Sequence, residues 1–204
     1  MVNFKLNKGR LVASLALGLT FTILMSLAGF DASCQQIRNN VLRLHILANS
    51  DSTADQQIKL KVRDALLTEF EGLFDTATNL EQAQSVAENN LDRLEEVAKA
   101  TLVKEGAEYS VKVSVAPSDF STRVYDQYTL PAGEYMAVRV VLGEGKGQNW
   151  WCVCFPNLCI GSAAQKDNDA SFGKQEQQVV KGGEKYKVKF KVVEIYEKIK
   201  NKLK

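Results

Sequence analysis

An uncharged, apolar run from Leu11 to Phe30 is the first pattern along the chain, and it follows the basic residues Lys5, Lys8 and Arg10. About twenty residues in a helix are about 30 Å long, which is enough to cross the hydrocarbon core of a bilayer. A basic stretch before an apolar run is the layout of a secretory signal, whose basic end stays in the cytoplasm. Residues 1–30 are therefore predicted to be a signal peptide or a membrane anchor, and the remainder is predicted to be exported.

The residues at the end of this run do not decide whether the segment is cleaved or retained. Ser26 and Ala28 form the small-x-small pattern that suits a signal peptidase, whereas a run of this length also serves as a retained anchor. Cys34 follows the run closely enough to suggest a lipoprotein, in which lipid is attached to such a cysteine. Asp31 argues against this, because an aliphatic residue is expected at its position in a lipoprotein signal. Cleavage and anchoring are both favoured over lipidation.

Residues 41–48 alternate apolar and polar side chains, which is typical of a strand with one buried face. Arg43 and His45 fall on its polar side. The periodicity then changes, because apolar residues recur three and four positions apart over two long segments. Helices are predicted from about Thr53 to Phe74 and from about Asn79 to Glu105, and their short connection predicts an antiparallel pair.

Alternation returns after the helices and predicts further strands. Residues 109–115 form a half-buried strand, residues 121–130 a weaker one, and residues 134–142 and 149–155 two strong ones. The Gly-rich segment 143–148 predicts that the last two strands pair as a hairpin. These elements together predict an α+β fold, with a mainly antiparallel sheet packed against two long helices and preceded by the N-terminal signal or transmembrane helix.

The C-terminal part of the chain has a different composition. Residues 161–185 are polar and are predicted to be an exposed, mobile loop, and residues 186–204 a basic strand and helix. From residue 181 to the end there are nine lysines and three glutamates. This basic end fits either a contact with an anionic membrane surface or a solubilising surface, and the second interpretation is favoured. Residues 31–204 are predicted to form a single domain.

Charge argues against nucleic acid as a partner. The whole chain has 26 basic and 24 acidic residues, and residues 1–30 contain three of the basic ones and none of the acidic ones. The remainder therefore has 23 basic and 24 acidic residues, which is a formal charge of −1. A nucleic-acid-binding domain needs a strongly basic face, which this balance does not favour.

Four cysteines bear on disulfide and metal chemistry: Cys34, Cys152, Cys154 and Cys159. Close cysteines in an exported chain favour a disulfide. Cys152 and Cys154 are badly placed to pair with each other, since residues two apart in a strand lie roughly 6–7 Å apart. Cys159 can reach either across a turn, and Cys152 with Cys159 is the candidate pair. Zinc is disfavoured because the three close thiolates lack a fourth ligand nearby, and no metal or cofactor is expected.

Catalytic chemistry leaves few signals in the sequence. His45 is the only histidine, and hydrolysis by a serine or cysteine nucleophile usually needs one as its base. The chain has no G-x-S-x-G or H-E-x-x-H motif, and the lysine spacing in GEGKG differs from that of a P-loop. A secreted hydrolase that uses His45 is kept as the alternative, but a non-enzymatic protein without a small-molecule substrate is favoured.

Two segments carry distinctive polar and aromatic side chains. RLHILANSD, residues 43–51, places charged and amide groups at a strand-to-helix junction, and GEGKGQNWWCVCFPNLC, residues 143–159, places two tryptophans beside a Gly-rich loop. Exposed tryptophans are enriched at binding hot spots. The competing interpretation is an ion-pair network that ties helix to sheet, together with two covered tryptophans. The candidate partner-binding residues are Arg43, His45, Asn49, Asp51, Arg139, Trp150 and Trp151.

The same segments resemble the stage II sporulation protein R family of endospore-forming bacteria. The resemblance is carried by VLRLHILANSDSTADQQIKLKVRDALL, by PAGEYMAVRVVLGEGKGQNWWCVCFPNLC and by the N-terminal apolar run, although Cys154 stands where a bulky apolar residue is more typical. The resemblance implies a signalling protein that is made in the forespore and exported into the space between the forespore and mother-cell membranes. It also implies a partner, a membrane-embedded aspartic peptidase that processes the precursor of sporulation sigma factor E.

Overall fold

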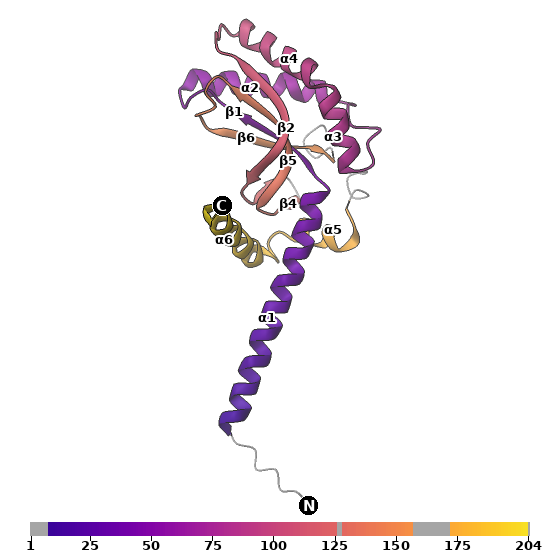
Figure 1. Cartoon of the computed structure of the whole chain (residues 1–204), viewed down its shortest axis with the longest axis vertical. Coiled ribbons are helices and arrows are strands. Elements are labelled where there is room, and N and C mark those ends of the chain that lie inside the picture. Colours follow the sequence, from indigo (N-terminus) through magenta and orange to yellow (C-terminus); the bar gives the residue numbers. More distant parts are fainter. Residues whose placement is uncertain (1–7, 126–127, 157–171, 204) are drawn as a thin grey trace, which may run out of the picture.

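The computed structural model describes residues 8–125, 128–156 and 172–203, and it has a long N-terminal helix that leads into a domain of mixed helices and strands (Figure 1). The predicted α+β class is confirmed. In chain order the described elements are α1 (Lys8–Asn39), β1 (Leu42–Leu47), α2 (Thr53–Phe70), α3 (Leu80–Asn89), α4 (Leu91–Lys104), β2 (Val111–Phe120), β3 (Arg123–Tyr125), β4 (Tyr128–Leu130), β5 (Gly133–Leu142), β6 (Asn149–Phe155), α5 (Lys174–Lys181) and α6 (Lys187–Leu203).

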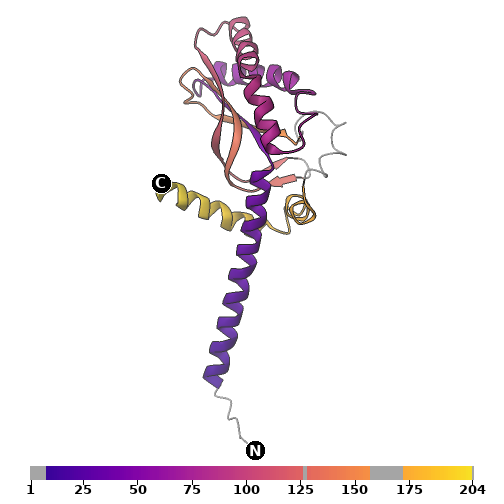
Figure 2. The ribbon, with the colours of Figure 1, turned by 45° about the vertical axis from the view of Figure 1, so that its right-hand side comes forward.

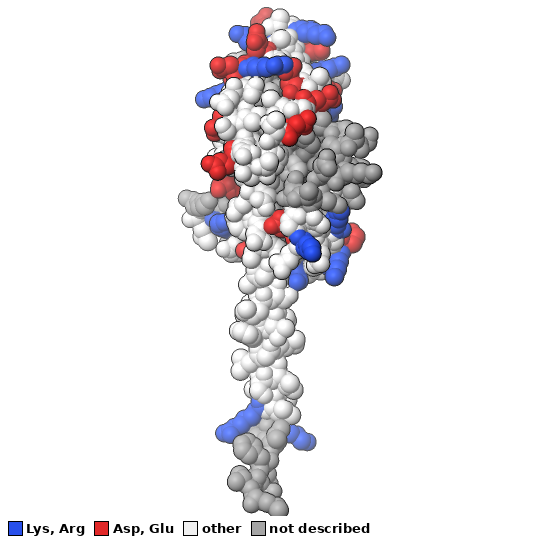
Figure 3. All heavy atoms as spheres, turned by 90° about the vertical axis from the view of Figure 1, so that its right-hand side faces the viewer, with Lys and Arg blue, Asp and Glu red and all other residues white. Residues whose placement is uncertain are grey.

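The helix α1 has two parts. Almost all side chains before Phe30 are exposed, and Figure 3 shows this part as an uncharged column with basic residues at its start. By length and composition it can cross a membrane. Phe30, Cys34 and Ile37 are buried against the domain, and their spacing places them on one side of the helix. α1 is therefore longer than the predicted apolar segment, and it enters the domain without a break.

The main sheet has four strands in the order β2-β5-β1-β6. β1 is parallel to β5 and antiparallel to β6, while β2 and β5 are antiparallel. The hairpin predicted from residues 134–142 and 149–155 is wrong, because β1 lies between these two strands. β1 lies inside the sheet, and its side chains are buried on both faces. Arg43 and His45, on the side predicted to be polar, are therefore buried as well. The weak strand predicted over 121–130 is instead β3 and β4, which form a separate two-stranded sheet.

The helix α2 begins where the sequence predicts. The side-chain oxygen of Ser52 caps it by accepting a hydrogen bond from the backbone N–H of Asp55, at 3.1 Å. The helix ends at Phe70, four residues before the predicted end, and Gly72 then adopts a left-handed conformation with φ of 74°.

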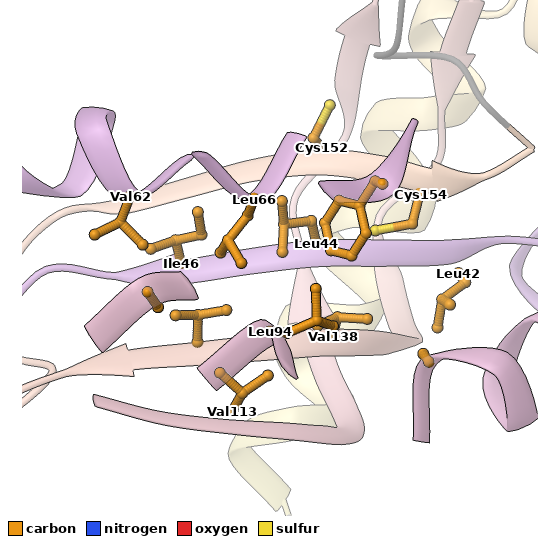
Figure 4. Packing of buried hydrophobic residues seen from close by; sticks show 14 of the residues in the cluster. Leu42, Leu44, Ile46, Val62, Leu66, Leu94, Val113, Val138, Cys152 and Cys154 are labelled. Atoms are coloured by element: carbon orange, nitrogen blue, oxygen red, sulfur yellow. The ribbon is translucent and has the colours of Figure 1, made fainter. Parts of the chain in front are cut away.

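The single helix predicted from Asn79 to Glu105 is in fact two helices, α3 and α4, which are separated at Asn90. The Asn90 side-chain amide donates a hydrogen bond to the backbone oxygen of Val86, at 2.8 Å, and such local bonds compete with helix continuation. α2, α3 and α4 cover one face of the sheet (Figure 1). Figure 4 shows the resulting core, where Leu44 and Ile46 of β1 pack against Val62 and Leu66 of α2.

The opposite face of the sheet is covered over part of its area by the end of α1, by β3 and β4, and by the C-terminal helices. The loop predicted over residues 161–185 is wrong for its second half, because Lys174–Lys181 form the helix α5 and bury Val179 and Val180. Residues 157–171 lie outside the described residues. The predicted basic strand and helix at 186–204 is a single helix over Lys187–Leu203, so its strand part is also wrong.

Candidate functional site

The candidate site lies on the sheet face that turns away from α2 and α4. Arg43 and His45 of β1 both point to this face, since residues two apart in a strand share a side. In the strand register His45 lies between Arg139 of β5 and Trp151 of β6. The structure therefore brings together four of the seven predicted partner-binding residues. We call Arg43, His45, Arg139 and Trp151, together with Arg123 of β3, the donor cluster.

Arg43 is the most unusual member of the donor cluster, because its side chain is 0% exposed and none of its recorded contacts is a carboxylate. Its guanidinium carbon lies 3.9 Å from the ring centre of Phe120 and 4.9 Å from that of Tyr135. Its Nη2 donates a hydrogen bond to the hydroxyl of Tyr125. Burial lowers the pKa of Arg43, while the neighbouring tyrosines raise it. A ring of aromatic side chains thus replaces the ion pair that a buried cation usually needs.

His45 is 8% exposed, and its Nε2 lies 2.9 Å from the side-chain oxygen of Asn149. Burial lowers the pKa of His45, the bond to Asn149 raises it, and the charges of Arg139 and Arg43 lower it further. The imidazole is consequently neutral near pH 7. The rings of Phe120 and Trp151 also pack against His45. Among the described residues, no serine or cysteine nucleophile forms a hydrogen bond with the imidazole.

The donor cluster is rich in polar atoms that have no hydrogen-bond partner within the described part of the chain. One such atom comes from each member, and all five are shielded from solvent; they are Arg43 Nη1, His45 Nδ1, Arg123 Nε, Arg139 Nε and Trp151 Nε1. Four of these are N–H donors. A buried donor without an acceptor costs about 1–3 kcal/mol, so this concentration on one face calls for an explanation.

A surface pocket of about 600 Å³ opens beside the donor cluster, at the edge of the sheet formed by β6. Arg123, Tyr125, Asn149 and Trp151 line it, and the guanidinium carbon of Arg123 lies 4.1 Å from the ring centre of Trp151. The pocket thus reaches both the outermost donors and the residue that holds His45. An acceptor-bearing group that enters here lies beside the charge of Arg123, and the shielded N–H groups lie behind the pocket lining.

Asn49 and Asp51, two further predicted residues, lie beyond the end of β1 and have intramolecular partners. The Asn49 side chain donates to Asp55 and accepts from the backbone N–H of Glu144, at 2.9 and 3.0 Å. Asp51 accepts from the backbone N–H of Gln148, at 2.7 Å. Both side chains therefore fasten the 143–148 loop to the start of α2, and this role accounts for them without a partner.

Trp150 points to the other face of the sheet, as expected for the neighbour of Trp151. It packs against the core under the helices, and the guanidinium carbon of Arg63 lies 5.3 Å from its ring centre. Its predicted contact with a partner stays a prediction.

The cysteines divide into two kinds. Cys152 is disulfide-bonded, whereas Cys34 and Cys154 are free and buried. Cys159, its predicted partner, lies outside the described residues. Burial raises the pKa of the Cys154 thiol far above its ordinary value, which makes this thiol unreactive. Within the described ranges no group of three His, Cys, Asp or Glu side chains is placed to hold a metal ion.

Several residues of the site were missed at the level of sequence. Phe120, Tyr125 and Tyr135 surround Arg43, and Arg123 stacks on Trp151. The sequence predicts Arg123, Tyr125 and Tyr135 only as parts of strands, and Phe120 falls between two predicted strands. Figure 1 shows β2 and β5 side by side, and the rings of Phe120 on β2 and Tyr135 on β5 have centres 5.5 Å apart. The aromatic and basic side chains of STRVYDQY were the available signal.

Comparison with known proteins gives one family. The family model described as stage II sporulation protein R matches residues 38–165. The chain is also 40% identical over 149 residues to a protein of Bacillus subtilis (strain 168) named Stage II sporulation protein R. That alignment covers 71% of this chain and 66% of the relative, just under two thirds of its length. No solved structure matches.

Proposed function

The chain belongs to the stage II sporulation protein R family, and from that premise we propose that it is an exported signalling protein of endospore formation that acts by binding. In this proposal the protein is made in the forespore and acts in the space between the forespore and mother-cell membranes. Its partner is a membrane-embedded aspartic peptidase, which it activates to process the sigma-E precursor.

The observation that carries the binding role is the donor cluster beside an open pocket. Its unpaired N–H groups cost stability in the free protein, and a partner that supplies acceptors removes this cost. A carboxylate is the best match, because it is an acceptor with two oxygens and gains from the charge of Arg123, which lines the pocket. We therefore propose that an acidic segment of the peptidase docks in the pocket lined by Arg123 and Trp151.

The helix α1 supports the delivery step of this proposal. Lys8 and Arg10 precede its apolar part, and the basic end of such a helix stays in the cytoplasm. The domain that follows Phe30 then emerges on the far side of the membrane. Because α1 runs unbroken into the domain, a retained helix would hold the donor cluster at a fixed height above the bilayer.

Reconstitution tests this function. The full chain in nanodiscs is added to the outer face of vesicles that carry the peptidase and enclose the sigma-E precursor, and precursor cleavage is followed on gels. The unsubstituted chain should trigger cleavage, and Arg123→Gln should abolish it, because Arg123 lines the pocket. Arg93→Gln is the matched control, since Arg93 is 69% exposed on α4, on the other side of the sheet.

Two results would count against the proposal, and they are distinguishable. Absence of cleavage with the unsubstituted chain removes the activator function itself. Cleavage by Arg123→Gln at the rate of Arg93→Gln keeps the function and removes the pocket beside the donor cluster as its site. Circular dichroism of both variants establishes that neither has lost its fold.

A further inference from the structure

The C-terminal helix α6 has three distinct sides. One side is buried against the rest of the protein through Phe190, Val193 and Glu197. The opposite side is an apolar stripe whose members are between 40% and 83% exposed; they are Val188, Val192, Ile195, Tyr196, Ile199 and Leu203. At about 100° per residue these six positions share one side of the helix. The flanks between stripe and buried side are basic and carry Lys187, Lys189, Lys191, Lys198, Lys200 and Lys202.

The start of α6 lies against α1 where the apolar run of α1 ends. The ring of Phe30 lies 5.4 Å from that of Tyr186 and 5.1 Å from that of Phe190. Lys189 also donates a hydrogen bond to the hydroxyl of Ser26, at 2.9 Å. Figure 2 shows α6 projecting sideways from α1 at this level. If the apolar run of α1 spans a bilayer, α6 begins at the membrane surface.

The apolar stripe points toward the membrane side of the molecule. Glu197, on the buried side of α6, lies 3.8 Å from Arg38, which is on the part of α1 inside the domain. The stripe is on the opposite side of α6 and therefore faces the direction in which the exposed, apolar part of α1 extends. An apolar stripe with basic flanks is the pattern of a helix that lies in the interface of an anionic membrane. The lysine stems then reach up to the headgroups while the stripe meets the acyl chains.

We infer that α6 is an interfacial helix that rests on an anionic lipid surface beside the membrane-spanning part of α1. The inference rests on the proposed membrane insertion of α1, but it does not depend on the peptidase. Six lysines against two glutamates within α6 favour lipid as the occupant of the stripe over an apolar protein surface. The membrane interpretation of the basic C-terminus is thereby preferred over a solubilising surface, because the lysines border an exposed apolar stripe.

The test places a fluorescent label on each side of α6 in the full chain. One variant, Ile199→Cys, places the label in the apolar stripe. The matched control, Asn201→Cys, places it at an exposed position on the side of α6 away from the stripe. Each is labelled with an environment-sensitive dye and reconstituted into phosphatidylglycerol–phosphatidylethanolamine vesicles with or without spin-labelled lipid. The free cysteines Cys34 and Cys154 are buried and should not take up the dye. The unsubstituted chain, treated with the dye in the same way, measures any background labelling.

The label at position 199 should show blue-shifted emission and lose most of its intensity with spin-labelled lipid, whereas the label at position 201 should behave as in water. Adding Ile195→Glu to the 199 variant should reverse both effects, because a carboxylate in the stripe opposes insertion. Equal, water-like behaviour at both positions overturns the inference. A blue shift at position 199 without quenching by the lipid also overturns it, since the stripe is then covered by protein, such as a second copy of this chain.

Discussion

Replacing Arg43 by methionine tests whether the buried cation of the donor cluster contributes to stability or to the proposed signalling. The guanidinium is completely buried, and its recorded contacts are aromatic rings, the Tyr125 hydroxyl and, at 3.5 Å, the backbone oxygen of Cys152. Methionine is unbranched and fills a similar slot between the rings without a charge. The substitution therefore removes the cation and its unpaired Nη1 donor while keeping most of the apolar packing.

The balance of energies at Arg43 is close to zero. Burial of a cation costs several kcal/mol even after the protein relaxes. Phe120 and Tyr135 lie within 5 Å of the guanidinium carbon, and two desolvated cation–π contacts contribute about 2 kcal/mol each. Since gain and cost nearly cancel, Arg43→Met is expected to leave the free energy of unfolding unchanged or to raise it by up to about 4 kcal/mol. Arg43→Ala, which also leaves a cavity, should lower it by about 2–5 kcal/mol.

Urea unfolding of the full chain in nanodiscs, followed by the fluorescence of Trp150 and Trp151, measures both changes. The same preparations enter the cleavage assay, where Arg43→Met is expected to be inactive although folded. A loss of about 3–5 kcal/mol in Arg43→Met would refute the reasoning, because it would mean that the cation is a structural tie. Full activity of a stable Arg43→Met variant would show that the buried cation is not needed for the proposed signalling.

Two further predictions concern His45 and the 143–148 loop. The pKa of His45 in the folded protein lies below its ordinary value of 6.5, so the unfolded chain takes up a proton first as the pH falls, and stability should decrease from about pH 7 to about pH 5. In His45→Gln the urea midpoint of unfolding should depend less on pH over this range. Parallel pH curves for the variant and the unsubstituted chain would contradict the prediction. A Cβ at Gly147 would lie 2.1 Å from the backbone oxygen of Ser50, so Gly147→Ala should cost about 1–3 kcal/mol in the same assay. Gly173→Ala is the control, since the nearest atom there is 3.6 Å away, and equal losses in both variants would show that the close approach does not matter.

Local patterns were sufficient for most individual elements. The apolar run in α1, the alternation in β1 and β5, and the Ser52 cap of α2 each lie within a few neighbouring residues, so periodicity and capping chemistry predict them. The short helix α5 escaped because its segment is polar, and the two valines that fix it are buried only against distant parts of the chain.

The strand order could not be read from the sequence, because it depends on contacts between distant residues. A Gly-rich connection between two strong strands predicts a hairpin, yet the 143–148 loop crosses the end of β1 instead and bonds to the backbone oxygens of Ala48 and Asn49. The same limit applies to the site. Arg43, His45, Arg139 and Trp151 were identifiable as unusual side chains, but they lie side by side only because of the strand order β5-β1-β6. The pocket that Trp151 shares with Arg123 depends in addition on where the second sheet lies.

The central position of β1 also ties folding to the order in which the chain emerges during the proposed export. Arg43 pairs in the sheet with Ala137, 94 residues later, and β6 is completed only at Phe155. A chain that emerges from α1 onward exposes its middle strand long before either neighbour arrives, and sheets closed by such distant segments fold slowly. The pocket beside this face cannot form until β6 has emerged, because Asn149 and Trp151 of β6 line it. If the domain is exported as proposed, nearly complete translocation would therefore have to precede signalling, because a chain stalled before Phe155 lacks the strand that completes the pocket.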